Sequence, residues 1–149
     1  MKKTRRKRLV DQLDSLFSLY IRKRDGIVTD GKCVLGCGPI ECCSHLITRG
    51  KHSVRWSEIN ATAMCMGANL RHEYQPEIYT SWWIAKYNAD AYQRLVRQSN
   101  ILPRYTILEL EELRDKYKMK LEHIHTWDAD KIRRYLVGLI IPINGHEGA

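Results

Sequence analysis

The sequence contains no long apolar run. No stretch of the 149-residue chain has the length and apolarity of a membrane span or a signal-peptide core. Internal repeats and low-complexity linkers are also absent. We therefore expect a soluble, intracellular (cytoplasmic) protein with no membrane partner. We expect a single domain over residues 1–149, because 44% apolar residues in a chain of this length suffice for one core.

Acidic residues are the minority charge. The chain has 17 Asp and Glu against 25 Lys and Arg, which gives a formal net charge of +8. Such a field favours anionic partners, of which nucleic acid is the commonest, although acidic proteins and membrane surfaces also fit. Six of the positive charges lie in the first eight residues. This basic run has two interpretations, a disordered solubilising tail or an arm that follows phosphates.

The spacing of apolar residues predicts helices at both ends of the chain. Residues 5–24 have the pattern of a basic amphipathic helix, which we expect Asp25 and Gly26 to end. After residue 69 the helical pattern returns, with Thr106 and Asp128 as expected caps. The helices predicted there span residues 69–74, 76–87, 89–99, 106–123 and 128–141.

The segment between these helical parts is rich in turn formers. Short apolar runs at 40–47 and 53–56 flank a TRGKH loop, which predicts a compact hairpin. The sequence as a whole therefore predicts an α+β fold, with a small β-rich centre between an N-terminal helix and a helical C-terminal half.

Four of the five cysteines lie between residues 33 and 43. In a reducing compartment such clustering indicates metal ligation or a reactive thiol more than disulfides. Cys33 and Cys37 have the spacing of two zinc ligands on a glycine-containing turn, and Cys65 stands at the expected start of a helix. Ala68 occupies the position where a matching Cys-x-x-Cys pair would have its second thiol, so the fourth zinc ligand is missing from its usual place.

Several groups could complete this zinc site. Cys42, Cys43, His72 or a water could take the fourth position, but Cys42 and Cys43 are neighbours on a predicted strand and face opposite ways. The alternative is that the cysteines bind no metal and are small buried hydrophobic residues.

His45 is the residue that most directly suggests catalysis. On a strand its side chain points to the same side as Cys43, and Asn60 and Asn69 follow around the hairpin and at the next helix. A neutral imidazole can take a proton from water, and a hard oxygen ligand can help hold a divalent cation on a phosphodiester. The spacing alone also fits a scaffold histidine with asparagines at turns and caps.

Five motifs carry a resemblance to a known family. CVLGC, CSHLITRG, VRWSEIN, MCMGAN and EIYTSWW occur in this order within residues 33–83. In this combination the chain resembles the HNH (His-Me finger, ββα-metal) endonucleases. It is most similar to the phage recombination NinG/Rap-like branch and more distantly similar to recombination endonuclease VII. The resemblance implies a ββα-metal core over 26–75 with a zinc-knuckle-like loop, preceded by the helix at 5–24 and followed by a helical extension over 76–141.

The resemblance also implies roles for single residues. His45 matches the general base, Asn60 matches the asparagine that braces the loop and so orients the base, and Asn69 matches a ligand of the catalytic Mg²⁺ or Mn²⁺. Three structural Zn²⁺ thiolates match Cys33, Cys37 and Cys65.

This chain departs from the family at one further position. Ser44 stands where many HNH nucleases have an acidic metal ligand just before the base. His72 and Glu73, one turn into the following helix, are candidate substitutes, and a solvated helix face is the alternative for both.

The resemblance implies a phosphodiester hydrolase whose partner is DNA, in branched or recombination-intermediate form, and not a small molecule. We expect the loop residues Arg49, Lys51, His52 and Arg55 to hold backbone phosphates beside the cut, which gives a preference for shape more than for sequence. A homodimer would suit cleavage of both arms of a junction. Two other hypotheses stay open: a non-catalytic nucleic-acid-binding protein with a degenerate HNH scaffold, and a basic protein that blocks another nuclease or a host factor.

Overall fold

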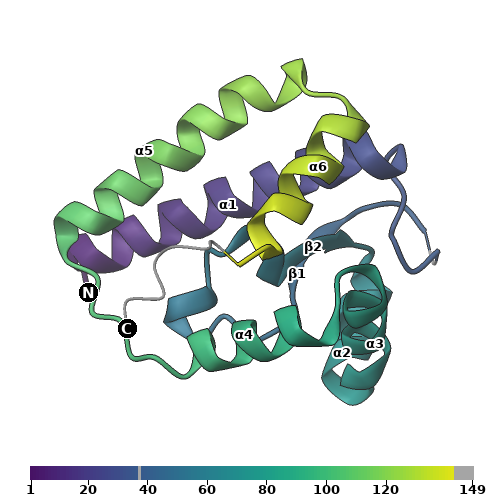
Figure 1. Cartoon of the computed structure of the whole chain (residues 1–149). Helices are drawn as coiled ribbons and strands as arrows, with labels where there is room; N and C mark the ends of the chain where they lie inside the picture. Colours follow the sequence, from purple (N-terminus) through teal and green to yellow (C-terminus); the bar gives the residue numbers. More distant parts are fainter. Residues whose placement is uncertain (37, 143–149) are drawn as a thin grey trace.

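The computed structural model describes residues 1–36 and 38–142, and within them the protein is mostly helical with one small antiparallel sheet (Figure 1). The α+β class predicted from the sequence is confirmed. In the described ranges no helix has the length and apolar character needed to cross a bilayer. The elements, in chain order, are α1 (Arg5–Thr29), β1 (Cys42–His45), β2 (Ala61–Met64), α2 (Met66–Tyr74), α3 (Pro76–Lys86), α4 (Ala89–Ser99), α5 (Ile107–His123) and α6 (Ala129–Ile140), with short 3₁₀ turns at His52–Val54, Glu58–Asn60 and Ile124–Thr126.

The helix α1 forms the spine of the molecule. In Figure 1 it lies between α5 on one side and the sheet on the other. The expectation that Asp25 and Gly26 end this helix is wrong. The Asp25 side chain is buried and accepts a hydrogen bond from the backbone N–H of Ala63 at 2.8 Å, so a tertiary contact takes up the carboxylate that would otherwise favour a turn. The helix ends instead at the next Asp-Gly pair, where Asp30 and Gly31 both have positive φ.

The N-terminal basic run is largely part of α1. The helix begins at Arg5, and Thr4 caps it by accepting a hydrogen bond from the Lys7 backbone N–H. Lys3 and Lys7 both pair with Asp11, whose pKa these two amines hold at about 2. From Arg5 onward the run is therefore an ordered helix end and not a disordered tail.

The sheet has two strands in antiparallel register, with Cys42 opposite Met64 and His45 opposite Ala61. The predicted second strand over 53–56 is wrong, because residues 52–54 form a 3₁₀ turn and the partner strand lies at 61–64. All four residues of β2 are buried, so this strand has no solvent-exposed face, and the regular alternation of a half-buried strand does not apply to it.

The C-terminal helices follow the sequence prediction closely. The bounds of α3, α4, α5 and α6 each agree with the predicted ranges to within one residue. Thr106 caps α5 by accepting from the Glu109 N–H at 3.1 Å, and Asp128 caps α6 by accepting from the Lys131 N–H at 2.8 Å. The helix predicted at 69–74 begins earlier, at Met66.

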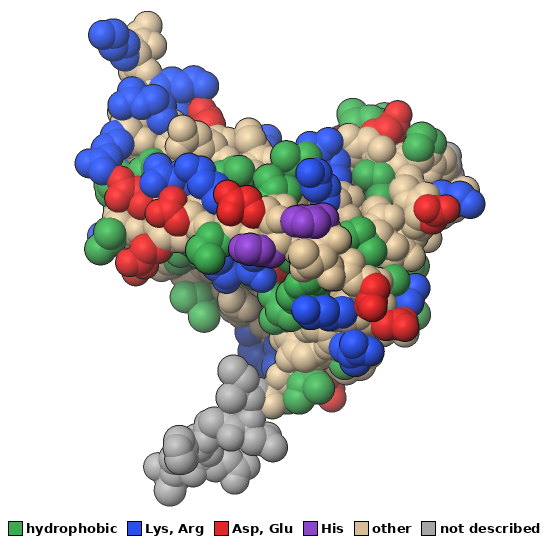
Figure 2. Space-filling model, turned by 90° about the horizontal axis from the view of Figure 1, so that it is seen from above, with side chains coloured by type: hydrophobic (Ala, Val, Ile, Leu, Met, Phe, Trp, Pro, Cys, Tyr) green, Lys and Arg blue, Asp and Glu red, His purple; other side chains and the backbone are tan. Residues whose placement is uncertain are grey.

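The face formed by α5 and the neighbouring part of α1 carries charges of both signs. Figure 2, which looks onto this side, shows Lys and Arg interleaved with Asp and Glu, and basic side chains gathered toward the N-terminal end. Ion pairs neutralise part of the charge there, including Arg5 with Glu111 and Arg114 with Asp115. This surface is therefore less suited to a polyanion than its share of Lys and Arg suggests.

A buried guanidinium ties α1 to the second strand. Arg24 is only 2% exposed and donates to the backbone carbonyls of Glu58 and Ala61, at 3.0 Å in each case. It also donates to the Asp25 carboxylate at 2.7 Å, and Asp25 in turn accepts from the Ala63 N–H. Every polar group in this network has a partner, which is the condition under which a buried charge is tolerated.

The Glu58 carboxylate extends this network toward the C-terminal helices. It accepts hydrogen bonds from Tyr20 at 2.6 Å, from Lys120 at 3.0 Å and from Tyr135. Burial alone would raise the pKa of Glu58, but the hydroxyl donors Tyr135 and Tyr20, with the charges of Lys120 and Arg24, outweigh burial and lower that pKa. One ionised carboxylate thereby joins α1, α5 and α6 beside the sheet.

The substitution Arg24→Met tests whether this network anchors the strand. It removes the donor and leaves Asp25 and two carbonyls without their partner, so we expect the free energy of unfolding to fall by about 3 to 5 kcal/mol. Urea unfolding measures the loss. The matched control is Arg133→Met, since Arg133 is exposed and its ion pair with Asp130 lies on the surface, and it should change stability by less than about 1 kcal/mol. Equal effects of the two substitutions would contradict the anchor.

Candidate active site

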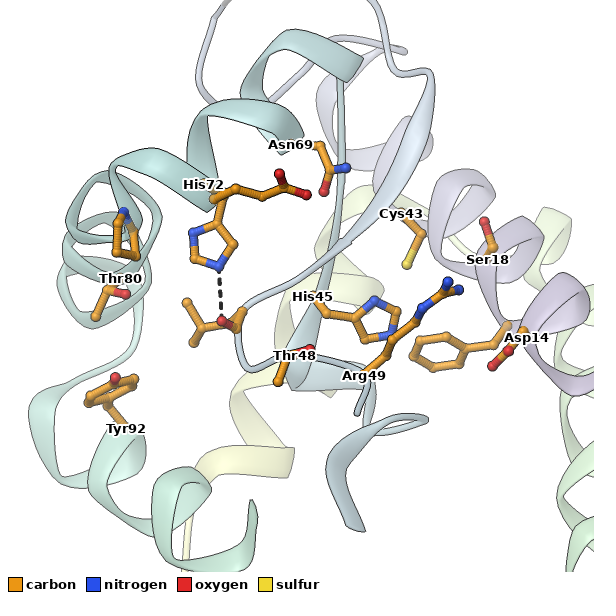
Figure 3. A pocket seen from close by; sticks show the side chains of 14 residues that line it. Asp14, Ser18, Cys43, His45, Thr48, Arg49, Asn69, His72, Thr80 and Tyr92 are labelled. Atoms are coloured by element: carbon orange, nitrogen blue, oxygen red, sulfur yellow. Dashed lines mark hydrogen bonds between the residues drawn. The ribbon is translucent and has the colours of Figure 1, made fainter. Parts of the chain in front are cut away.

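Several of the residues singled out in the sequence line one cavity. It has a volume of about 710 Å³ and opens between α1, the end of β1 and α2 (Figure 3). Its lining includes His45, Arg49, Asn69, His72 and Glu73. Five residues singled out in the sequence are therefore brought together here from two separate segments of the chain, 45–49 and 69–73.

The imidazole of His45 is oriented by the backbone. Its Nε2 lies 2.9 Å from the carbonyl oxygen of Arg55. Because a carbonyl can only accept, Nε2 carries the proton and Nδ1 keeps its lone pair in the neutral ring. The ring of Phe17, with its centroid 5.8 Å away, covers one side of the imidazole.

The charge state of His45 follows from this environment. Burial lowers the pKa of His45 below its usual value, and the positive charges of Arg49 and Arg55 lower it further. The Arg55 carbonyl and the Asp14 carboxylate act in the opposite direction without reversing the shift. At neutral pH the ring is therefore an uncharged base.

Asn60 braces the loop that follows His45. Its side chain is fully buried, and its Oδ1 accepts from the Ile47 N–H at 2.8 Å. Its Nδ2 donates to the carbonyls of Ile47 at 2.9 Å and Val54 at 3.0 Å. The two ends of the loop are thus joined through one amide.

Two oxygen donors on α2 face the cavity. Asn69 and Glu73 are four residues apart, so they stack on one side of the helix, and both line the cavity. An amide oxygen with a carboxylate is a donor set that suits Mg²⁺ or Mn²⁺. Ser44 takes no part, because it is completely buried on the opposite face of β1 from His45.

His72 lines the cavity, but its side chain is hydrogen-bonded to the backbone, whereas the prediction made it a candidate metal ligand. Its Nε2 donates to the carbonyl of Leu46 at 2.9 Å, the contact drawn in Figure 3, and its ring packs edge-on against Tyr79. Its Nδ1 is buried and has no hydrogen-bond partner among the residues that the structure describes. Since one nitrogen is engaged and the other is closed off, we leave His72 out of the proposed ion site and regard it as a scaffold residue.

The predicted zinc ligands are only partly within the described residues, because Cys37 lies outside them. Cys33 and Cys65 are both buried in one hydrophobic cluster, which also contains Ala68. Burial raises the pKa of the Cys42 thiol, and the nearby Cys65 and Cys33 raise it further.

Among residues 1–36 and 38–142, no three His, Cys, Asp or Glu side chains are placed together as metal ligands. The donors described there do not make a zinc site by themselves, and the zinc prediction stays a prediction.

Cys43 faces the other way, into the cavity, as the alternation along β1 predicts. Burial raises the pKa of its thiol to about 12. The thiolate fraction at neutral pH is then negligible, so Cys43 does not serve as a nucleophile.

The four loop residues predicted to hold phosphate divide into two groups. Arg49, Lys51 and His52 are exposed, and Arg49 reaches the cavity wall. Arg55 is not available for this role, because its guanidinium forms a bidentate pair with Asp14 and its side chain is only 13% exposed. The prediction for Arg55 is corrected: an internal carboxylate already occupies its donors.

Sequence reasoning missed the contribution of the flanking helices to the cavity. Asp14, Phe17 and Ser18 of α1 form one wall, and Thr80 of α3 and Tyr92 of α4 complete the lining. Asp14 was the one recognisable signal, because it is a carboxylate at the margin of the apolar stripe that includes Leu13 and Phe17. The others look like ordinary helix residues.

Comparison with models of protein families places the chain in a known family. The family model described as "Bacteriophage Lambda NinG protein" matches residues 1–126. Searches of curated proteins and of solved structures returned no match. The matched range includes α1, the sheet and every residue of the cavity named above.

The substitution Asn60→Ala tests the brace. It leaves one N–H and two carbonyls of the loop without partners, so we expect a loss of roughly 3 kcal/mol in the free energy of unfolding. Amide exchange at Ile47 should accelerate by more than global unfolding explains, which NMR-detected hydrogen exchange measures. Asn100→Ala, at an exposed position after α4, is the control and should change neither quantity. Unaltered protection of the Ile47 amide would show that Asn60 does not hold the loop.

Proposed function

The chain belongs to the bacteriophage lambda NinG protein family, and from this membership and the geometry of the cavity we propose that it is a metal-dependent endonuclease of the HNH type. Its substrate is branched or recombination-intermediate DNA, and its role is in phage recombination. One observation carries the proposal: a single cavity holds a neutral imidazole oriented by a backbone carbonyl and, on the adjoining helix, two hard oxygen donors one turn apart.

His45 is the general base of the proposed reaction. With Nε2 donating to the Arg55 carbonyl, Nδ1 is the atom that takes the proton from the attacking water. The lowered pKa keeps Nδ1 unprotonated at neutral pH. The engaged Nε2 fixes the plane of the ring, so the base is oriented before substrate arrives.

Asn69 and Glu73 are the residues that would hold the catalytic Mg²⁺ or Mn²⁺. When bound, this ion polarises the scissile phosphate and stabilises the leaving oxygen. Mg²⁺ is commonly held by one or two protein ligands, with waters and substrate phosphates filling the other positions. An Asn and Glu pair is therefore a sufficient protein contribution, and it compensates for the serine at position 44.

Phosphates beside the cut are held by Arg49, with Lys51 and His52 further along the exposed loop. Contacts of this kind bind backbone and carry no base information. The proposed preference is therefore for DNA structure, such as a junction, and affinity should fall steeply as salt is raised.

A cleavage assay tests the proposed function. Purified protein is incubated with supercoiled plasmid and with a four-way junction in Mg²⁺ or Mn²⁺, and then with chelator. We expect chelator-sensitive nicking that His45→Ala reduces by about 100-fold or more, the usual contribution of a general base. Glu73→Gln should raise the Mg²⁺ concentration needed for half-maximal rate.

His125→Ala is the matched control, because His125 is exposed on the 3₁₀ turn after α5 and lies outside the cavity. It should cleave as the unaltered protein does. Tight DNA binding without cleavage in any divalent metal would instead support a binding protein with a degenerate scaffold. Cleavage that survives His45→Ala would remove the proposed base.

The pH dependence of cleavage follows from the state of His45. The pKa of His45 is lowered below its usual 6.5, so the ring loses its basic form only at pH values below that point. We expect the acid limb of kcat/KM to have its midpoint below pH 6.5, measured by initial rates between pH 5 and 8 at constant ionic strength. A midpoint clearly above 6.5 would contradict the assignment.

A further inference from the structure

Asp14 is the one acidic residue of α1 that lines the cavity. Its Oδ1 accepts from Arg55 Nε at 2.9 Å and its Oδ2 from an Arg55 terminal nitrogen at 2.5 Å. A third donor, the indole Nε1–H of Trp56, reaches Oδ1 at 2.9 Å. One carboxylate thus receives three hydrogen bonds from two adjacent residues that are 41 and 42 positions away in the chain.

These contacts lead directly to the proposed base. The residue whose guanidinium Asp14 fixes is the same residue whose carbonyl accepts from His45 Nε2. Arg55 also donates to the backbone carbonyl of Arg49 at 3.3 Å, so its side chain holds the start of the loop as well. Displacement of Arg55 would therefore move the acceptor that selects which ring nitrogen of His45 carries the proton.

The ion pair between Asp14 and Arg55 is strong enough to hold the Arg55 carbonyl in place beside His45. A bidentate guanidinium–carboxylate pair is charge-assisted and directional, and here it is mostly withdrawn from solvent, with Asp14 23% and Arg55 13% exposed. Trp56 is buried and packs against Tyr105, so the third donor is also held in place. The position of the Arg55 backbone is consequently fixed to α1.

We propose that Asp14 is a positioning residue for His45: through its bidentate pair with Arg55 it holds the Arg55 carbonyl where it keeps the His45 proton on Nε2 and leaves Nδ1 as the basic nitrogen. The helix α1 is then a functional part of the site and more than a support. The inference deepens the proposed function, since it rests on His45 as the base, but the contact itself is measurable in the absence of any substrate.

The test is ¹⁵N NMR of the histidine rings in the full-length protein at a pH where His45 is neutral. In the unaltered protein we expect His45 to show the two separated ring-nitrogen shifts of an Nε2–H tautomer, assigned by their loss in His45→Ala. In Asp14→Asn the charge and the bidentate pair are lost, so the two shifts should move toward each other as both tautomers become populated. Cleavage should lose about tenfold or more in kcat, with KM for DNA within about twofold, because an oriented base is lost and a phosphate contact is not.

Asp11→Asn is the matched control. Asp11 lies on the same helix and carries the same charge, but it pairs with Lys3 and Lys7 on the surface and does not line the cavity. It should leave the His45 shifts and kcat unchanged. Equal changes in both variants would show a general charge effect and overturn the proposal.

Arg55→Lys decides the question if Asp14→Asn does not fold. Lysine keeps the positive charge but cannot form the two-pronged contact, so the same convergence of the His45 shifts is expected. Ring-nitrogen shifts identical to those of the unaltered protein, in a folded Asp14→Asn or Arg55→Lys protein, would overturn the proposal. If the unaltered protein cleaves no DNA but the His45 shifts still converge in Asp14→Asn, the positioning contact is supported and the nuclease assignment fails.

Discussion

The buried pair of Arg24 and Asp25 is the constraint on which the rest of the structure depends. A two-stranded sheet is barely stable by itself in water, so β1 and β2 need an external support. Arg24 donates a hydrogen bond to the carbonyl of Ala61, and Asp25 accepts one from the N–H of Ala63. These two contacts attach the outer edge of β2 to α1. The pairing of β1 with β2 then fixes the strand that carries His45. The candidate base is therefore held in place by two charges in the interior of the molecule.

The parts of the fold that sequence predicted are those decided locally. The helices from residue 76 onward have apolar periodicity and capping side chains such as Thr106 and Asp128, and these signals act within one turn of the chain. The second strand escaped prediction because ATAM is short and buried on both faces, and the side chains that hold its outer edge come from α1, far away in sequence. The end of α1 was misjudged for the same reason, since Asp25 serves a tertiary contact there.

The candidate site shows the same division. His45, Asn60 and Asn69 were predicted as site residues because their order along the chain is itself the motif. Arg55 was assigned to phosphate because isolated arginines in basic loops usually face solvent, and only the fold brings Asp14 beside it. Ser44 and Glu73 show a second limit of prediction from sequence. Sequence shows a serine directly before His45, but only the turn of α2 shows that Glu73 and Asn69 face the same cavity.

The loop between the strands is held at its two ends and exposed in between. Asn60 ties Ile47 to Val54, and Asp14 ties Arg55 to α1, so the stretch that faces solvent is short. When a flexible segment becomes ordered on binding, conformational entropy is lost, and the loss grows with the number of residues that must be fixed. With both ends already fixed, the entropy cost of ordering the loop around Arg49 in the proposed DNA complex would be confined to a few residues. The internal pair with Asp14 therefore takes the Arg55 guanidinium away from the exposed loop surface and fixes this end of the loop to α1.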